Sequence, residues 1–301
     1  MNNEEIKAQQ PHISPADANT VLQAVLSIFD GMSCGQIALN RAGIKYDNYF
    51  ASEIKPHAIR CTQSNYPNTI QLGSVLNVKG SDLPKIDLLL GGSPCKGISR
   101  LNKNQEGLEH AESKLFWEYV RLLEEVKPKY FLLENTHGKK EATEIITETL
   151  GVKPISINSK LVSAQNRPRY YWTNIPGVKQ PTDKGITTKD VFDYSGELAD
   201  ECRVKWLTSE SGKKSVAKGY TRVNPYPKSG CLTANGHKKW NENYLLKDGV
   251  YRYLSQNELE KLQTLPIDYT SALNYDEAYD CIGDGWTVDI IAHILSFAEW
   301  S

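Results

Sequence analysis

The first 180 residues alternate between short apolar runs and amphipathic stretches. Strands are predicted for the apolar runs at 21–29, 46–52, 69–72, 86–90, 130–133 and 155–162. Between them, residues 114–126 carry apolar side chains at the 3.6-residue spacing of a helix, and a second helix is predicted at 141–150. Strands that alternate with helices are typical of α/β proteins, so we expect a doubly wound, mixed sheet.

The pattern changes in the second half of the chain. From Gly177 to about Thr221 the sequence is rich in turns and basic residues, whereas helices are predicted at 256–262 and 290–298. The polar N-terminal stretch lacks apolar periodicity, which predicts a disordered tail. We therefore divide the chain into this tail at 1–20, an α/β domain at 21–180, a smaller inserted domain at 181–275 and a segment at 276–301 that returns to the α/β domain.

The composition is that of a globular protein, with 301 residues, 40% of them hydrophobic and 24% charged. No apolar stretch approaches the roughly 18 to 20 residues of a membrane span, and the N-terminus lacks the apolar region of a secretory signal. We expect an intracellular, cytoplasmic protein. The six cysteines form no CxxC pair, so the sequence indicates neither a disulfide framework nor a metal site.

The charge is unevenly distributed, although the net charge is only −1. Between Arg203 and Lys239 there are nine Lys or Arg residues and one acid, Glu210. Such a segment is either a solvated face or a surface that binds nucleic-acid phosphates, and the one-sided charge favours the second interpretation. The candidate DNA contacts in it are Arg203, Lys205, Lys213, Lys214, Arg222 and Lys238.

A cysteine follows the predicted strand at 86–90, in the sequence GGSPCKG. Strand ends of open α/β sheets are where ligands bind, so Cys95 is a candidate nucleophile, although a lone cysteine is more often an ordinary buried residue. The strand at 130–133 delivers Glu134 and Asn135 to the same edge. Downstream, Arg167 and Arg169 flank a proline in an aromatic setting, which indicates recognition of an anion or a carbonyl group.

The first strand leads into FDGMSCG, a glycine-bearing turn before a predicted helix. A turn of this kind lets the backbone approach a ligand closely, although any strand-to-helix loop can contain two glycines. Glu53 follows the next strand, about 20 residues further on, where nucleoside-binding folds bind ribose hydroxyls. A solvated acid at the end of a strand is an equally good interpretation of Glu53 alone.

Taken in order, FDGMSCG, Glu53, GGSPCKG, Glu134-Asn135, QNRPR and the terminal GDGWTV resemble the cytosine-C5 DNA methyltransferase family. The match runs from about residue 24 to the C-terminus and is most similar to the de novo branch of animals, which has similar sequences in phages and bacteria. The resemblance implies the sheet of S-adenosylmethionine-dependent methyltransferases and a target-recognition role for the smaller domain. It also implies double-stranded DNA as the partner, and we expect a monomer of prokaryotic or phage character.

The resemblance implies a role for each catalytic candidate. Cys95 would add to C6 of a cytosine that is flipped out of the duplex, and Glu134 would stabilise the charge that develops at N3. Arg169, with Arg167 beside it, would hold the base through its O2 atom. Residues 100–110 would close over the base, with DNA contacts from Lys96 and Arg100.

The cofactor site implied by the resemblance is S-adenosylmethionine bound at the same sheet edge. Its methionine part would meet the first glycine turn, Glu53 would bind the ribose, and the segment from Trp286 to Val288 would return to the cofactor as a C-terminal strand. Ser74 stands where the family often has an acid that meets the adenine, and Asp87 or water is expected to substitute. The residues assigned to this site are Phe29, Asp30, Gly31, Ser33, Gly35, Glu53, Ser74, Pro94, Asn135, Trp286 and Val288.

Two further departures from the family pattern occur at Lys96, in place of glutamine or asparagine, and at Thr136, in place of an aliphatic residue. Neither removes a reactive atom. One alternative function is methylation of tRNA, since one branch with these motifs acts on tRNA, but its distinctive motif after the Glu-Asn pair is absent. A second alternative is a catalytically idle DNA-binding homologue, which the retention of Cys95 and Glu134 disfavours. Methylation of a small molecule would leave the Ser-Pro-Cys thiol unexplained.

Overall fold

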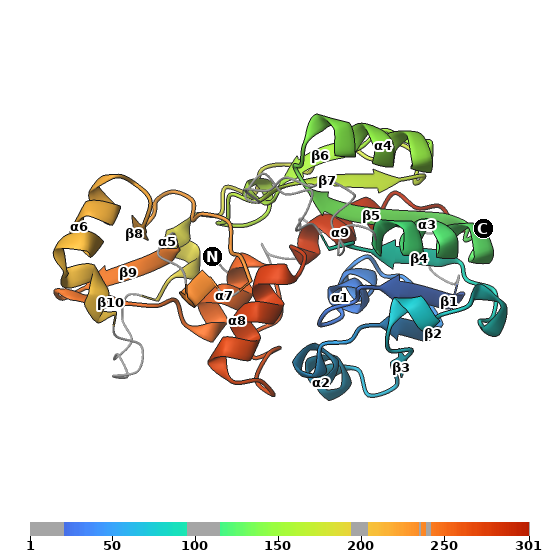
Figure 1. Ribbon diagram of the computed structural model, residues 1–301, viewed down its shortest axis with the longest axis horizontal. Helices are drawn as coiled ribbons and strands as arrows, with labels where there is room; N and C mark the ends of the chain where they lie inside the picture. The colour runs from blue at the N-terminus through green and yellow to red at the C-terminus, as the bar shows by residue number, and fades with distance from the viewer. Residues whose placement is uncertain (1–20, 95–114, 194–203, 235, 239–241, 301) are drawn as a thin grey trace, which may run out of the picture.

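A seven-stranded mixed sheet organises the larger part of the molecule, and a three-stranded sheet organises the smaller part (Figure 1). The computed structural model describes residues 21–94, 115–193, 204–234, 236–238 and 242–300. Cys95, Lys96, Arg100 and Arg203 therefore lie outside the described residues, as does the predicted tail.

The large sheet has the strand order β3-β2-β1-β4-β5-β7-β6. All described pairings in it are parallel except those of β7, which is antiparallel to both of its neighbours. This confirms the expected α/β fold with a doubly wound, mixed sheet. The strands are β1 (Val21–Ile28), β2 (Lys45–Ser52), β3 (Ile70–Gln71), β4 (Leu88–Gly91), β5 (Tyr130–Thr136), β6 (Ile155–Asn158) and β7 (Pro168–Thr173).

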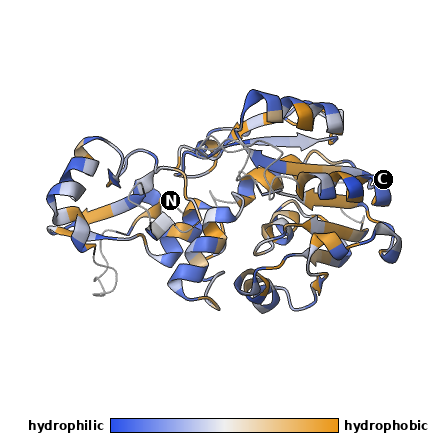
Figure 2. Cartoon of the chain, in the orientation of Figure 1, coloured by the Kyte–Doolittle hydropathy of each residue, from blue (hydrophilic) through white to orange (hydrophobic). Residues whose placement is uncertain are grey.

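Helices cover both faces of this sheet, which explains the unbroken apolar run of β4. Leu88 and Leu90 belong to one hydrophobic cluster, and Leu89 between them belongs to the cluster on the other face. In Figure 2 hydrophobic residues are concentrated in the central strands. The flanking helices are α1 (Cys34–Arg41), α2 (Pro56–Asn65), α3 (Leu115–Val126), α4 (Lys140–Leu150) and α9 (Val288–Leu295).

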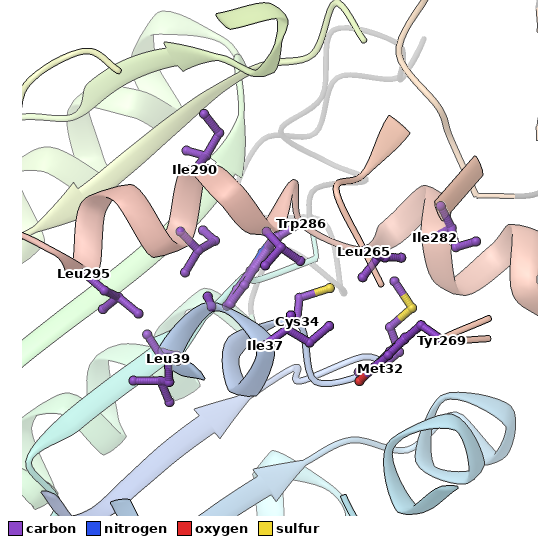
Figure 3. Close-up of a cluster of buried hydrophobic side chains, with 14 of the residues drawn as sticks. Met32, Cys34, Ile37, Leu39, Leu265, Tyr269, Ile282, Trp286, Ile290 and Leu295 are labelled. Carbon is purple, nitrogen blue, oxygen red and sulfur yellow. Dashed lines mark hydrogen bonds between the residues drawn. The ribbon is translucent and has the colours of Figure 1, made fainter. Parts of the chain in front are cut away.

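Helices α1 and α9 pack against each other on one face (Figure 3). Leu39 of α1 lies near Leu295 of α9, and both side chains are almost fully buried, as are Ile37 and Ile290. The expected C-terminal strand at 286–288 is wrong, because residues 286 and 287 form a loop and α9 begins at Val288. The apolar repeat from Val288 onward has helical spacing, and it buries one face of α9 against α1.

The smaller part contains β8 (Arg222–Val223), β9 (Asn243–Lys247) and β10 (Val250–Arg252), with β9 in the centre. Its small core comprises Val204, Leu207 and Tyr244. Helices α5 (Thr188–Val191), α6 (Glu210–Ala217), α7 (Gln256–Leu262) and α8 (Tyr275–Asp284) complete the described part of the fold. Helix α8 contacts both α7 and α2, and so connects the two parts of the molecule. No helix in the described ranges combines the length and apolar character needed to cross a bilayer.

A buried ion pair joins β10 to α7. Both terminal nitrogens of the Arg252 guanidinium donate to Glu258 at 2.7 Å, and Arg252 also donates to the carbonyl of Asp193. Glu258 is satisfied further by the backbone N–H groups of Asp193 and Ser255. Because both side chains are almost fully buried, the loss of either partner leaves a charge without compensation.

We expect Glu258→Gln to lower the free energy of unfolding by about 3 kcal/mol, since it strands the buried Arg252 guanidinium. Urea denaturation followed by circular dichroism measures the change. Glu210→Gln is the matched control, because Glu210 pairs with Lys213 on the exposed surface of α6 and such pairs contribute little. Equal shifts for the two variants would contradict a stabilising role of the buried pair.

Candidate active site

The carboxyl ends of β4 and β5 meet the beginning of β7 at one edge of the sheet. Strand β4 ends at Gly91, and Gly92, Ser93 and Pro94 lead from it toward Cys95. Asn135 holds this segment in place, since its amide nitrogen donates to the carbonyl of Ser93 at 3.3 Å and to its hydroxyl at 3.1 Å. The described residues that precede Cys95 are therefore fixed to the strand that carries Glu134.

Glu134 forms an ion pair with Arg169. The Nε atom of Arg169 lies 2.9 Å from Oε1 of Glu134, and the two side chains are only 12% and 11% exposed. The antiparallel register brings them together. Thr136 lies opposite Arg169, and Glu134 lies two positions before Thr136 on the same face of β5. Burial opposes the charge on Arg169, but Cys231 and Glu134 outweigh it and raise the pKa of the guanidinium above its ordinary value.

Trp286 completes this corner of the site. A Cβ atom on Gly92 would come within 2.9 Å of the indole Nε1 and 3.3 Å of Oε2 of Glu134. A side chain at position 92 would therefore displace the indole or the carboxylate. The glycine that follows β4 allows Trp286, Glu134 and the approach to Cys95 to converge.

Arg167 is held by backbone carbonyl groups. Its side chain is 3% exposed, and its guanidinium donates to the carbonyls of Leu232, Gly283 and Gly285 at 2.7, 3.1 and 2.9 Å. Arg167 was expected beside Arg169 at the base, and the terminal nitrogens of its guanidinium are largely engaged by backbone carbonyls. Arg167 thereby ties the start of β7 to the segment at 231–232 and to the loop between α8 and α9.

Cys231 lies between the two arginines, and the sequence analysis did not identify it as a site residue. Its Sγ atom is 3.4 Å from Nη1 of Arg167 and 3.7 Å from Nη2 of Arg169. Burial raises the pKa of this thiol, but the two guanidinium groups outweigh it and the net pKa is lowered. Only long-range contacts create this environment, so no local sequence signal could have revealed it.

The first glycine turn brings two carboxylates together. Phe29, Gly31 and Ser33 all have positive φ angles near 60°, which folds the turn tightly between β1 and α1. Asp30 accepts hydrogen bonds from Ser33 and, at 2.8 Å, from the hydroxyl of Tyr49. Burial raises the pKa of Asp30 to about 6, although these hydrogen bonds lower it.

Glu53 folds back onto this turn. Its Oε2 accepts the backbone N–H of Gly31 at 2.8 Å, and its Oε1 accepts the N–H groups of Ile54 and Lys55. The structure thus places Glu53 beside Asp30, whose pKa it also raises. Gly35 has a packing role, because a Cβ atom there would lie 2.6 Å from the hydroxyl of Tyr49.

The edge beyond Glu53 contains two apolar side chains that the sequence analysis missed. Ile54 is 70% exposed and Leu76 is 64% exposed. Ile54 follows Glu53 directly, and Leu76 follows Ser74, whose hydroxyl accepts the N–H of Leu76 at 3.4 Å. The available sequence signal was the apolar Ile54 directly after Glu53, at the polar end of β2. Together the two offer apolar surface for a planar ring.

Asp87 cannot take the place of an acid at position 74. Its N–H donates to the carbonyl of Ala24, and its carboxylate accepts the N–H of Gln23, so it lies at the amino end of β4. Ser74 follows β3 at the opposite edge. The expected substitution by Asp87 is therefore wrong, because the direction of the parallel strands separates the two positions.

The predicted DNA contacts of the smaller part that the structure describes lie on its surface. Two of them pair with acids, Lys213 with Glu210 at 3.2 Å and Lys238 with Asp276 at 3.1 Å. The predicted DNA contacts that are described and exposed are Lys205, Lys213, Lys214, Arg222 and Lys238. Within the described ranges, no group of three acidic, histidine or cysteine side chains is arranged to bind a metal.

Comparison with known proteins identifies a matching family. The family model for C-5 cytosine-specific DNA methylases matches residues 23–175 and 139–298. Type II methyltransferase M.NgoBV of Neisseria gonorrhoeae is 32% identical over 170 residues, which cover 49% of this chain and 40% of that protein. Orphan methyltransferase M.SPRI of Bacillus phage SPR is 31% identical over 216 residues, which cover 64% and 48%. The match thus spans about two fifths to one half of the length of these relatives.

Solved structures share the fold at low identity. The Entamoeba histolytica methyltransferase EhMeth superimposes with a TM-score of 0.75 at 15% identity, over 91% of this chain and 97% of that one. The Dnmt2 methyltransferase of S. pombe gives a TM-score of 0.69 at 17% identity, over 91% and 97%. At these identities the likeness concerns the fold.

The buried Asp30 predicts a pH dependence of stability. Its pKa of about 6 in the folded protein exceeds the ordinary 3.8, so its contribution to stability is fully present below pH 3.8 and is lost as the pH rises through 6. Relative to Asp30→Asn, the wild type should therefore lose about 2 kcal/mol of unfolding free energy between about pH 4.5 and about pH 7.5. Urea denaturation at the two pH values measures this difference. A difference between the variants that does not change with pH would refute the elevated pKa.

Proposed function

Because the chain belongs to the C-5 cytosine-specific DNA methylase family, we propose that it transfers a methyl group from S-adenosylmethionine to C5 of a cytosine in duplex DNA. The observation that carries the proposal is the buried Glu134–Arg169 pair at the end of β5, beside Gly92 and the segment that leads to Cys95. This is a carboxyl group held by a guanidinium in a site that admits little water, as base activation requires.

The turn after β1 and the edge beyond β2 fit the proposed cofactor. Asp30 would place negative charge near the cationic part of S-adenosylmethionine, and Glu53 would bind its ribose. Ile54 and Leu76 would provide apolar surface for its adenine. Among the remaining residues assigned to the cofactor, Ser74 follows β3, and Pro94 and Asn135 lie at the ends of β4 and β5. Trp286 lies beside Gly92, whereas Val288 is fully buried at the start of α9. When bound, the cofactor supplies an electrophilic methyl group on a sulfonium.

The chain's own residues would activate the base. Cytosine C5 is too weak a nucleophile on its own, so the thiolate of Cys95 would add to C6 and shift electron density toward N3. Glu134 would hold a proton at N3 and stabilise that density, and Arg169 would keep the carboxyl group oriented and lie beside O2 of the base. After methylation, loss of the C5 proton and departure of the Cys95 sulfur would restore the aromatic ring.

The target base must leave the duplex for this chemistry, since a stacked ring exposes neither face to a thiol. Flipping costs a few kcal/mol, which contacts in the pocket would recover. We propose that the segment at 181–275 binds the surrounding DNA through its exposed lysines and arginines, and reads bases in the groove with a few side chains. The description of the matching family, C-5 cytosine-specific DNA methylase, supports DNA as the substrate.

Transfer of tritiated methyl groups tests the proposed function. We expect label in 5-methylcytosine of mixed-sequence duplex DNA and none with Cys95→Ser, because serine is too weak a nucleophile at C6. Nucleoside analysis identifies the product, and bisulfite sequencing gives the recognition sequence. Label in tRNA alone would move the assignment to an RNA enzyme. Label in neither substrate would favour a DNA-binding homologue without activity.

Glu134→Gln should lower kcat by about 10²- to 10⁴-fold, because the amide cannot supply a proton at N3 and pairs poorly with Arg169. The affinity for S-adenosylhomocysteine, measured by calorimetry, should not change. Glu148→Gln, on the exposed side of α4, is the matched control and should retain full activity. Similar kcat values for the two variants would rule out Glu134 as the group that activates the base.

A further inference from the structure

A basic cavity of about 480 Å³ lies between the two parts of the molecule, next to the site described above. Lys160 and Asn166 line it from the large part, and Arg222 and the segment at 227–231 line it from the other side. Its lining contains three cationic side chains and no carboxylate. A cavity with this composition suits an anion of the size of a phosphate group.

Lys160, Asn166 and Arg222 bring hydrogen-bond donors to the lining. The ammonium group of Lys160 is exposed and has no partner among the described residues. The Oδ1 atom of Asn166 already accepts from Asn158 at 2.7 Å, so its amide nitrogen is the group left for a ligand. Arg222 lies over Gly230, where a Cβ atom would come within 2.6 Å of the guanidinium carbon.

Lys228 also lines the cavity and holds its backbone in place. Its Nζ donates to the carbonyls of Lys160, Ser163 and Ile186 at 2.6, 3.0 and 2.5 Å. The carboxylates that act on it at longer range, Asp183 and Asp190, do not line the cavity. The cation therefore contributes its field to the cavity while it holds the surrounding backbone rigid.

The cavity adjoins the groups that hold the base in the proposed function. Cys231 lines the cavity, its Sγ atom contacts Arg169 at 3.7 Å, and Arg169 pairs with Glu134 at 2.9 Å. A flipped nucleotide stays attached to its own strand through its phosphates. We therefore expect that strand to leave the base pocket beside this basic cavity.

We propose that this cavity binds a backbone phosphate of the DNA strand that carries the target cytosine, with Lys160, Asn166 and Arg222 as its donors. The proposal rests on the proposed function, since it takes the nucleotide held by Glu134 as its reference point. The lining residues of the cavity come from both parts of the molecule. Binding of the phosphate would therefore fix the base pocket relative to the recognition segment.

The salt dependence of DNA binding tests the proposal without turnover or a known recognition sequence. The logarithm of the affinity falls with the logarithm of salt concentration by about 0.9 for each phosphate neutralised. We expect Lys160→Ala and Arg222→Ala each to reduce this slope by about 1 on mixed-sequence duplex DNA. Lys153→Ala is the matched control, because this exposed lysine precedes β6 at the opposite edge of the sheet. Slopes equal to that of the control would overturn the proposal.

Neutral methylphosphonate linkages locate the phosphate. In a duplex with the mapped site, one linkage next to the target cytosine should weaken binding of the wild type but not weaken binding of Lys160→Ala further. Equal losses for both proteins at every linkage would refute a phosphate site at Lys160. This experiment uses the wild type as its reference and remains informative if Arg222→Ala folds poorly.

The two proposals fail in different ways. Methyl transfer to DNA with unchanged salt slopes would leave the enzyme established and reject the phosphate site. Reduced slopes in a protein that transfers no methyl group would support phosphate binding and reject the catalytic function. Affinity for S-adenosylhomocysteine should be the same in Lys160→Ala and the wild type, and a parallel loss of both affinities would indicate disruption of the fold and overturn the assignment.

Discussion

The buried guanidinium of Arg167 constrains the rest of the site. A cation without water is costly unless its hydrogens are bonded, and the partners here are carbonyls from residues 232, 283 and 285. Two segments far apart in the sequence must therefore keep their positions relative to the start of β7, around this one side chain. Trp286 follows directly from one of them and Cys231 precedes the other, so the packing around Gly92 and the environment of Arg169 depend on this arrangement.

The site has two electrostatic halves. Asp30 and Glu53 make the end of β2 and the turn after β1 acidic, whereas Arg169, Arg222 and the lysines near the smaller sheet make the other side basic. A cationic cofactor and a polyanionic substrate would thus be attracted to different sides of the same sheet edge. The Glu134–Arg169 pair lies in the basic half.

Most of the fold followed from the sequence because hydrophobic periodicity is local. The apolar runs of β1, β4 and β5 and the amphipathic α3 lie within a residue or a few residues of their predicted bounds. β7 was not predicted as a strand, since two arginines and a proline obscure its alternation. The partners of a polar side chain are set by tertiary contacts, which explains why the carbonyl partners of Arg167 and the position of Cys231 were not predicted. Asp87 was misplaced although its position at the start of the predicted strand at 86–90 already put it at the amino end.

The reversed direction of β7 has a consequence for how this protein can vary in length. Because β7 runs against β5, its first residues meet the last residues of β4 and β5 at one edge. Insertions or deletions between β6 and β7 would shift Arg169 relative to Glu134 and disturb the edge directly. Length changes after Thr173 fall at the far end of the strand, and there the chain can lengthen or shorten its path to the smaller sheet while the arginine stays in place.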